Sequence, residues 1–221
     1  ILHTLSKADH VIAVSSQTAE RVKRHMPKVS PPALHIRPNP VEAPPEASAA
    51  DIEAVEAMWS RLDPAKRSVR LLCLCRLIDW KGIDTSLKAV KDLRETGHDI
   101  SMIIAGKGPQ ETTLKAMCKQ LGLDDIVHFA GRTEGGRKTA LYESADIFMQ
   151  PGRRIGDQCE GFGITYIEAG LHGLPSLSGN AGGAPDAVKH EITGLTVDGD
   201  NQAAVNAALA RLIDEPARAH H

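Results

Sequence analysis

The sequence predicts an α/β fold, a Rossmann-like parallel sheet with helices on both faces. Two observations lead to this prediction. Short runs rich in Leu, Ile and Val alternate with amphipathic segments along most of the chain. In the amphipathic segments the apolar residues recur at steps of three and four, as in Leu87, Val90 and Leu93. Strands that alternate with helices in this way form parallel sheets whose two faces are both covered.

The first part of the chain is expected to form a strand, a helix and a second strand. The apolar runs are "VIAVSS" (11–16) and "ALHIRPNP" (33–40), and the amphipathic "QTAERVKRHMP" lies between them. The stretch "PNPVEAPPEASAAD" (38–51) is rich in Pro, Ala and Glu, which disfavours packed structure and indicates a linker. We therefore place a domain boundary near residue 42.

After the linker, a helix is expected over 51–63, followed by six strands that alternate with helices. The expected strands are 69–75, 101–106, 126–131, 146–152, 174–179 and 193–197. The expected helices are 84–97, 110–122, 136–145, 162–173, 183–190 and 201–214. Right-handed crossovers between parallel strands leave few topologies for this order.

Charge and hydropathy restrict the partners of the chain. The formal net charge is −2, and the Lys and Arg residues are dispersed, which argues against nucleic acid as a partner. No segment approaches the ~20 apolar residues of a membrane span. We therefore expect a cytoplasmic protein and leave peripheral contact with the inner membrane face open.

The cysteines and histidines do not suggest a metal site. Cys73 and Cys75 flank a leucine in an apolar run, and neither they nor Cys118 and Cys159 have CxxC spacing, so we interpret all four as small core residues. Unpaired cysteines suit a reducing cytosol. Four histidines lack a partner at i,i+4 or a nearby Cys suited to metal coordination: His98, His128, His172 and His190.

Residues able to bind anions follow the first two strands after the linker. The loops that leave the carboxyl ends of parallel strands meet at one edge of the sheet, where ligands bind. Arg76 and Lys81 follow one strand, and a guanidinium with an ammonium suits a diphosphate, although two solvated charges are the alternative. In "GKGPQE" (106–111) two glycines allow backbone N–H groups to approach an anion, or they form a tight connection only. The third glycine of the dinucleotide fingerprint is missing, which disfavours nicotinamide binding.

The segment "EGFGITYIEAG" (160–170) combines two acids with two glycines. Gly161 and Gly163 precede an expected helix, whose N-terminus favours negative charge. Glu160 lies ahead of this helix and Glu168 about two turns into it, roughly 12 Å further along. That separation exceeds the one used by paired glycosidase carboxylates. Because carboxylates accept hydrogen bonds from hydroxyls, the two acids suit a ligand with hydroxylated rings at both ends and phosphates between them. A solvated helix face is the alternative for Glu168.

In this order, these residues resemble the nucleotide-binding domain of GT-B retaining glycosyltransferases of family 4, glycosyl transferases group 1. The blocks that carry the resemblance are "LCRLIDWKGID", "IIAGKGPQ", "VHFAGRT", "YESADIFMQPG", "EGFGITYIEA", "GLPSLSG", "GGAPDAV" and "TGLTVDGDN". By this resemblance, residues 1–42 are the tail of an N-terminal acceptor domain with its hinge. Residues 43–221 are the C-terminal Rossmann-like donor-binding domain.

The resemblance also implies roles for individual residues. Arg76 and Lys81 bind the donor diphosphate and stabilise the departing charge, while Glu160 binds hydroxyls of the donor sugar. The implied catalytic residues are Arg76, Lys81 and Glu160. The implied nucleotide-binding residues are Gly106 near the phosphates, Arg132 and Thr133 near the base, Gly161, Phe162, Gly163 and Ile164 near sugar and phosphate, and Glu168 at the ribose hydroxyls.

The implied reaction is transfer of a glycosyl group from a UDP- or GDP-linked sugar with retention, in polysaccharide or glycolipid biosynthesis. No metal and no cofactor besides the donor are expected. The basic "PGRRIGDQCEG" (151–161) resembles an insertion of members that use GDP-mannose, and it suggests that Arg153 and Arg154 contact a phosphate. The N-terminal acceptor domain is the expected missing partner, needed for turnover, with a lipid-linked acceptor as one possibility. A GT-B sugar-nucleotide epimerase and a non-catalytic nucleotide-binding or scaffold module stay open as alternatives.

Overall fold

A six-stranded parallel sheet forms the centre of the computed structural model, which describes residues 7–26, 32–42 and 44–215. Its strands are β3 (Val69–Leu74), β4 (Ile100–Ala105), β5 (Val127–Gly131), β6 (Ile147–Gln150), β7 (Ser176–Gly179) and β8 (Gly194–Val197). They lie in the order β5-β4-β3-β6-β7-β8, and every pair is parallel. The chain proceeds in one direction from β3 to β5 and in the other from β6 to β8. The strand order therefore reverses between β3 and β6, where open α/β sheets bind their ligands.

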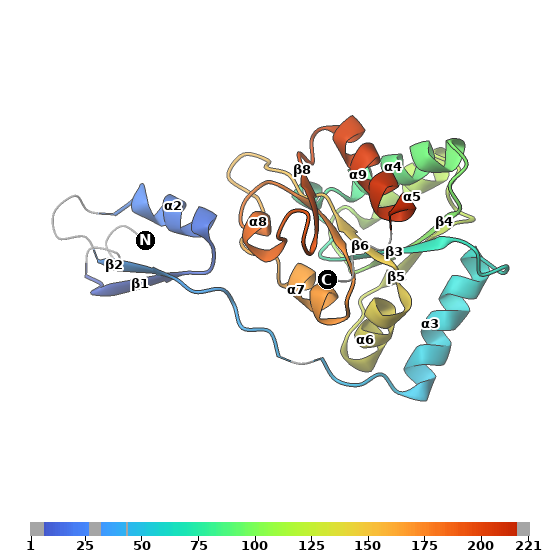
Figure 1. Ribbon diagram of the computed structural model, residues 1–221, viewed down its shortest axis with the longest axis horizontal. Helices are drawn as coiled ribbons and strands as arrows, with labels where there is room; N and C mark the ends of the chain where they lie inside the picture. Colours follow the sequence, from blue (N-terminus) through green and yellow to red (C-terminus); the bar gives the residue numbers. More distant parts are fainter. Residues whose placement is uncertain (1–6, 27–31, 43, 216–221) are drawn as a thin grey trace.

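Helices cover both faces of this sheet, which confirms the predicted fold class (Figure 1). They are α3 (Ala49–Leu62), α4 (Ile83–Glu95), α5 (Glu111–Gln120), α6 (Gly135–Ser144), α7 (Ile164–Leu171), α8 (Ala184–Ala187) and α9 (Gln202–Asp214). All the helices and strands expected from the sequence are present, within a few residues of their predicted bounds. A short 3-10 helix, η1 (Asp79–Lys81), was not predicted.

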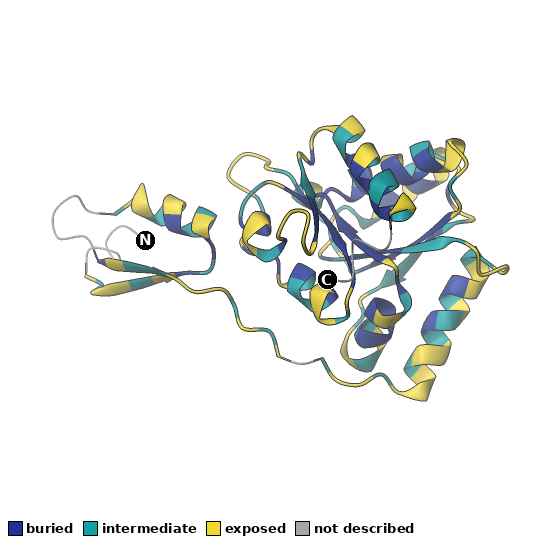
Figure 2. Ribbon diagram, in the orientation of Figure 1, coloured by how far each residue is buried: buried dark blue, intermediate teal, exposed yellow. Residues whose placement is uncertain are grey.

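The strands are buried on both faces, because alternate residues pack into two different cores. Leu71 and Cys73 of β3 pack against α4, α5 and α9. Leu72 of the same strand packs on the opposite side with α3 and α6, where Trp59 is fully buried. Figure 2 shows the sheet in dark blue between helices whose outer faces are exposed. This double burial is why the strands read as continuous apolar runs.

Three of the four cysteines belong to the core, as predicted. Cys73, Cys75 and Cys118 are buried, and all four thiols are free. Cys159 is partly exposed, so its interpretation as a core residue was wrong. It lies in the long loop after β6, which reaches solvent.

The N-terminal segment forms a separate βαβ unit, as the sequence predicts. Strands β1 (His10–Ala13) and β2 (Ala33–Ile36) pair in parallel, and α2 (Ser16–Lys23) packs on them. In Figure 1 this unit stands at one end of the molecule and an extended segment leads from it to α3.

The second half of the predicted linker is ordered by contacts with the sheet domain. Helix α3 begins at Ala49, inside the predicted linker, because Ser48 and Asp51 form a reciprocal capping box. Thr139 of α6 donates a hydrogen bond to the carbonyl oxygen of Pro45 at 2.7 Å. The Pro- and Ala-rich composition concealed this helix start, and the domain boundary near residue 42 stays a prediction.

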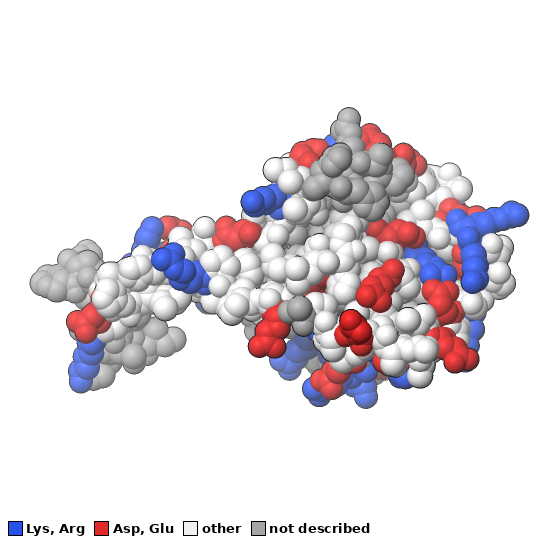
Figure 3. Space-filling view, turned by 60° about the horizontal axis from the view of Figure 1, so that its bottom comes forward, with Lys and Arg blue, Asp and Glu red and all other residues white. Residues whose placement is uncertain are grey.

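The surface mixes charges of both signs. In the view of Figure 3, basic and acidic side chains are interspersed over the sheet domain. Within the described ranges, no helix is both long enough and apolar enough to cross a membrane.

An ion pair between β3 and α3 predicts that the free energy of unfolding falls at acid pH. Arg70 donates two hydrogen bonds to the carboxylate of Glu56, at 2.8 and 3.1 Å. The guanidinium lowers the pKa of Glu56 below its ordinary 4.5. The pair therefore stabilises the fold above about pH 4.5, and this contribution is lost as pH falls through the lowered pKa. We expect urea unfolding to show a steeper loss of stability below about pH 4.5 in the wild type than in Glu56→Gln. Identical pH profiles would contradict this expectation.

Candidate functional site

A cleft of ≈ 750 Å³ opens at the carboxyl edge of the sheet, where the strand order reverses. Arg76 and Trp80 line it from the loop after β3, and Gln110 from the loop after β4. Residues 157–159 line it from the loop after β6, and Arg21 reaches it from α2. The cleft therefore collects side chains from both sides of the switch point.

A buried ion pair joins the loops that follow β3 and β6. The Nζ atom of Lys81 lies 2.5 Å from Oε2 of Glu160, and the two side chains are only 12% and 11% exposed. Gln150, the last residue of β6, donates to the same oxygen at 3.1 Å. The Lys81 ammonium also lies 4.6 Å from the ring centroid of Trp80. Two residues predicted from separate parts of the sequence are thus in direct contact.

The second predicted acid, Glu168 on α7, is held by two side chains of α6. Lys138 binds Oε1 at 2.6 Å, and the hydroxyl of Tyr142 donates to Oε2 at 2.9 Å. The Glu168 side chain is 14% exposed. Burial, followed by the neighbouring Glu168 carboxylate, raises the pKa of Tyr142, which keeps its hydroxyl protonated as a donor. The solvated-face alternative for Glu168 is therefore wrong.

Cys75, which directly precedes Arg76, interacts electrostatically with Glu160 and with Tyr142, the partner of Glu168. Burial raises the pKa of the Cys75 thiol to about 12, with Lys81 lowering it and Glu160 raising it. Cys75 in turn contributes to the raised pKa of Tyr142, the partner of Glu168. Arg76 follows directly, has an exposed side chain and makes no hydrogen bond or ion pair to any described residue. Its guanidinium is therefore available to an anion in the cleft.

At two of the predicted glycines there is no room for a side chain, because neighbouring atoms lie too close to the backbone. At Gly106, φ is +134°, and a Cβ atom would lie 1.8 Å from the carbonyl oxygen of Cys75. At Gly163, which caps α7, φ is +97° and a Cβ atom would lie 2.4 Å from the ring of Tyr166. Gly161 differs, since a Cβ atom there would meet nothing within 4 Å. Its Cα therefore faces open space, while its carbonyl oxygen accepts a hydrogen bond from Thr18.

The remaining predicted residues are less directly connected to the acids. Phe162 is buried and supports the turn, while Ile164 at the start of α7 is 41% exposed. Arg132 follows β5, at one end of the sheet, where Glu134 binds its guanidinium at 2.5 Å. The hydroxyl of Thr133 donates to the carbonyl of Gly131 at 3.4 Å. Neither Arg132 nor Thr133 has a recorded contact with Lys81, Glu160 or Glu168.

In the structure Arg153 is paired with carboxylates of the protein, and its contact with a phosphate stays a hypothesis. Its guanidinium makes a bidentate contact with Asp84 at 2.8 and 3.0 Å, donates to Thr85 and lies 3.6 Å from Asp200. Its side chain is 16% exposed, and Asp84 raises its pKa. The guanidinium is already neutralised by protein carboxylates. Arg154 is exposed and has no recorded partner in the described part of the chain.

We expect Arg153 to contribute to stability rather than to anion binding. Arg153→Met leaves Asp84 unpaired, and because both groups are partly exposed we expect a loss of about 1–3 kcal/mol in the free energy of unfolding. Arg154→Met is the matched control and should change it by less than about 0.5 kcal/mol. Urea unfolding measures both values. If Arg153→Met instead weakened binding of a nucleoside diphosphate without a loss of stability, the phosphate hypothesis would be supported.

Sequence reasoning missed Lys138, Tyr142 and Gln150. Gln150 gave a signal, because a polar side chain at the end of a buried strand needs a buried partner. Lys138 and Tyr142 are four residues apart and so share one face of α6. Their partner on another helix could not be identified from that spacing alone.

Helix α2 of the N-terminal unit contacts the loops around Glu160. The backbone N–H of Ser16 donates to Asp186 at 2.5 Å. The hydroxyl of Thr18 donates to the carbonyl of Gly161 at 3.4 Å, and Arg21 donates to that of Asp157 at 3.2 Å. The N-terminal unit therefore forms one wall of the cleft.

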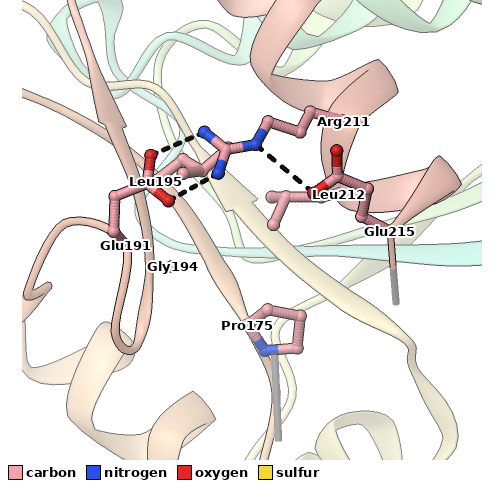
Figure 4. A pocket seen from close by; sticks show the side chains of 7 residues that line it. All are labelled: Pro175, Glu191, Gly194, Leu195, Arg211, Leu212 and Glu215. Carbon is pink, nitrogen blue, oxygen red and sulfur yellow. Dashed lines mark hydrogen bonds and ion pairs between the residues drawn. The ribbon is translucent and has the colours of Figure 1, made fainter. Parts of the chain in front are cut away.

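Other parts of the chain offer weaker candidates. Figure 4 shows a cavity of ≈ 20 Å³ at the amino ends of β7 and β8, where Arg211 is bound by Glu191 and lies near Glu215. It has room for about one water molecule and contains none of the predicted residues. In the ranges that the structure describes, no group of three or more His, Cys, Asp or Glu side chains is placed to hold a metal ion.

Known proteins share both the sequence pattern and the fold. The family model for glycosyl transferases group 1 matches residues 59–221. A GDP-mannose-dependent alpha-(1-6)-phosphatidylinositol monomannoside mannosyltransferase of Mycobacterium tuberculosis is 37% identical over 151 residues, covering 67% of this chain and 39% of the relative. The enzyme of the same name from Mycolicibacterium smegmatis is 36% identical over 173 residues, covering 77% and 45%. The chain thus spans less than half the length of these relatives.

Solved structures agree at the level of the fold. Sucrose-phosphate synthase from Thermosynechococcus elongatus superimposes with a TM-score of 0.78 at 25% identity, covering 99% of this chain and 52% of that one. Anabaena HepE in complex with UDP-glucose gives a TM-score of 0.76 at 20% identity, covering 99% and 58%.

Proposed function

Because this chain belongs to the glycosyl transferases group 1 family, we propose that it binds a nucleotide-sugar donor for transfer of the glycosyl group. The observation that carries the proposal is the contact between Lys81 and Glu160 beside the unpaired Arg76. These groups combine anion-binding and hydroxyl-binding side chains at the edge where the strand order reverses. That combination suits a diphosphate joined to a sugar.

We propose that the donor diphosphate binds Arg76 and Lys81. In the structure, Lys81 has Glu160 as its counter-charge. A bound diphosphate would accept hydrogen bonds from Lys81 and Arg76. Glu160 would retain its hydrogen bond from Gln150 and would accept a second hydrogen bond from a sugar hydroxyl. As the glycosidic bond breaks, negative charge grows on the departing nucleoside diphosphate. The two cations are already placed to stabilise that charge.

The nucleotide part would extend from this ion pair toward α7. Gly106 and the Gly161–Gly163 turn allow backbone N–H groups to approach the phosphates, and Glu168 would accept hydrogen bonds from the ribose hydroxyls. Phe162 and Ile164 support this turn, and Arg132 with Thr133 would lie near the base. We propose that Arg76 and Lys81 supply the positive charge at the diphosphate and that no metal ion is needed there.

The relatives suggest the donor and acceptor. Both mycobacterial enzymes are named as GDP-mannose-dependent and as acting on a phosphatidylinositol monomannoside. We propose GDP-mannose as the donor here, a lipid-linked acceptor at the inner membrane face, and retention at the anomeric carbon. We further propose that residues 1–42 belong to an N-terminal acceptor domain and its hinge. Turnover would require that domain, since closure of two domains excludes water and aligns the acceptor.

Calorimetry of this chain with GDP, UDP and ADP tests donor binding. We expect GDP to bind, and Arg76→Ala to weaken GDP by about tenfold, because a hydrogen-bonded charge is lost. Absence of binding to all three would support the scaffold alternative instead. In the two-domain protein, NMR of the product reports stereochemistry. Interconversion of the donor sugar without an acceptor would identify an epimerase.

A further inference from the structure

Glu168 is held in one position by two contacts that the sequence did not reveal. Each carboxylate oxygen has its own donor on α6, Lys138 at 2.6 Å and Tyr142 at 2.9 Å. Tyr142 is itself fixed, since its ring stacks on His172 with centroids 5.4 Å apart and planes 8° from parallel. It is 1% exposed and also packs against Phe148. The carboxylate therefore cannot rotate without breaking two hydrogen bonds.

This arrangement determines what Glu168 can bind. An ionised carboxylate has about four acceptor positions, two on each oxygen. Lys138 and Tyr142 use one on each oxygen, which leaves one on each oxygen for a ligand. Two adjacent acceptors with a shared orientation match two hydroxyls on neighbouring carbons. A single hydroxyl or a phosphate would use this pair of acceptors poorly.

The charge of Lys138 serves the same purpose. Glu168 is only 14% exposed, and the Lys138 ammonium is its counter-charge at 2.6 Å. Lys138 lies on α6, whereas Lys81, the partner of Glu160, lies in the loop after β3. The two acids are therefore held by two independent lysines. Loss of one lysine should leave the other acid unaffected.

We propose that Lys138 and Tyr142 are positioning residues that orient Glu168 to recognise the vicinal 2′- and 3′-hydroxyls of a ribose. This inference rests on the proposed function, because it concerns the nucleotide of the same donor. It assigns ribose selectivity to the contact between α6 and α7. The diphosphate is bound elsewhere, by the loops after β3 and β6.

The test compares GDP with 2′,3′-dideoxy-GDP by calorimetry on this chain. In the wild type we expect GDP to bind at least about tenfold more tightly, because the analogue forms no hydrogen bonds with a charged acceptor. In Lys138→Met and in Tyr142→Phe we expect this ratio to fall to about two or less. Binding of the dideoxy analogue should stay within about twofold of the wild type, since the diphosphate contacts are intact. Lys138→Arg retains the positive charge, so its ratio of GDP affinity to dideoxy-GDP affinity should stay close to that of the wild type.

Matched controls separate positioning from a general structural effect. Lys119→Met removes an exposed lysine from α5 and should leave both affinities unchanged. A variant that merely loosened the fold would weaken both nucleotides together, whereas the proposal requires loss for GDP only. Tyr142→Phe keeps the ring stacked on His172, so it carries the test if Lys138→Met does not fold. Thermal unfolding of each variant is recorded beforehand.

The outcomes for the two proposals are distinct. If the wild type binds neither nucleotide, the proposed function fails. If it binds GDP but does not discriminate against the dideoxy analogue, Glu168 does not recognise the diol and this inference is overturned. If it discriminates and both variants retain the same ratio, Lys138 and Tyr142 do not position Glu168, while the proposed function stands.

Discussion

Transfer activity in the two-domain protein is expected to fall by about 10²–10³-fold when Lys81 is replaced by methionine. Lys81 directly follows Trp80, which lines the cleft, and no other described lysine contacts Glu160. Without it, the charge that develops on the departing diphosphate loses one of its two proposed ligands, and Arg76 remains. The measurement is kcat and KM with GDP-mannose, where we expect the larger change in kcat.

A second variant separates chemistry from folding. Lys81→Met leaves the carboxylate of Glu160 without a counter-charge at 11% exposure, so the fold also loses stability. In the double variant Lys81→Met with Glu160→Gln, no unpaired charge remains, and we expect stability to return toward the wild-type value. Because Glu160 also belongs to the proposed site, Glu160→Gln alone is the reference, and we expect the double variant to be less active than it. Lys88→Met, on the exposed side of α4, is the control with normal activity. Full activity in Lys81→Met would remove Lys81 from the proposed mechanism.

Replacement of Gly106 by alanine is expected to destabilise the protein by at least about 2 kcal/mol. The backbone there has φ of +134°, which L side chains rarely adopt, and a Cβ atom would lie 1.8 Å from the Cys75 carbonyl oxygen. That carbonyl belongs to main chain immediately before Arg76. The displacement would therefore disturb the loop that carries both proposed phosphate ligands, and we expect weaker GDP binding as well. Urea unfolding and calorimetry measure the two effects.

Gly97→Ala is the matched control, because it introduces backbone strain at a positive φ without a steric clash of the new Cβ atom. Gly97 also has positive φ, +95°, but a Cβ atom there would meet nothing within 4 Å. We expect it to cost less stability than Gly106→Ala and to leave GDP binding unchanged, since Gly97 lies in a turn before β4. Equal losses for the two variants would show that strain alone, and not contact with Cys75, explains the requirement for glycine.

Much of the fold was predictable because the information is local. Apolar residues at helical spacing, such as Leu87, Val90 and Leu93, identify a helix regardless of what it packs against. The start of α3 was predicted two residues late, because its capping box lies inside a segment of Pro- and Ala-rich composition. Helix η1 was missed because three residues are too few to show a period. These errors concern the end of one element and one very short element, where local patterns are weakest.

The candidate site was only partly predictable. Arg76, Lys81, Glu160 and Glu168 were identified because they follow strands or precede a helix in a recognisable order. Their partners were not. Arg153 was expected to contact a phosphate because it is basic and lies in the insertion, and its pairing with Asp84, about 70 positions earlier, was not predicted. A side chain with a free charge and one with a paired charge look the same in a sequence.

The sequence alone predicted three features: the order of strands and helices along the chain, the burial of the strands, and the type of residue in each loop. They were predictable because periodicity and composition are properties of a few neighbouring positions. The pairings that define the site followed only from the tertiary structure. Lys81 meets Glu160 because β3 and β6 are neighbours at the reversal of strand order, and Lys138 meets Glu168 because α6 packs beside α7. Such contacts depend on how distant segments pack, and the energy of an ion pair depends on its burial, which no local pattern encodes.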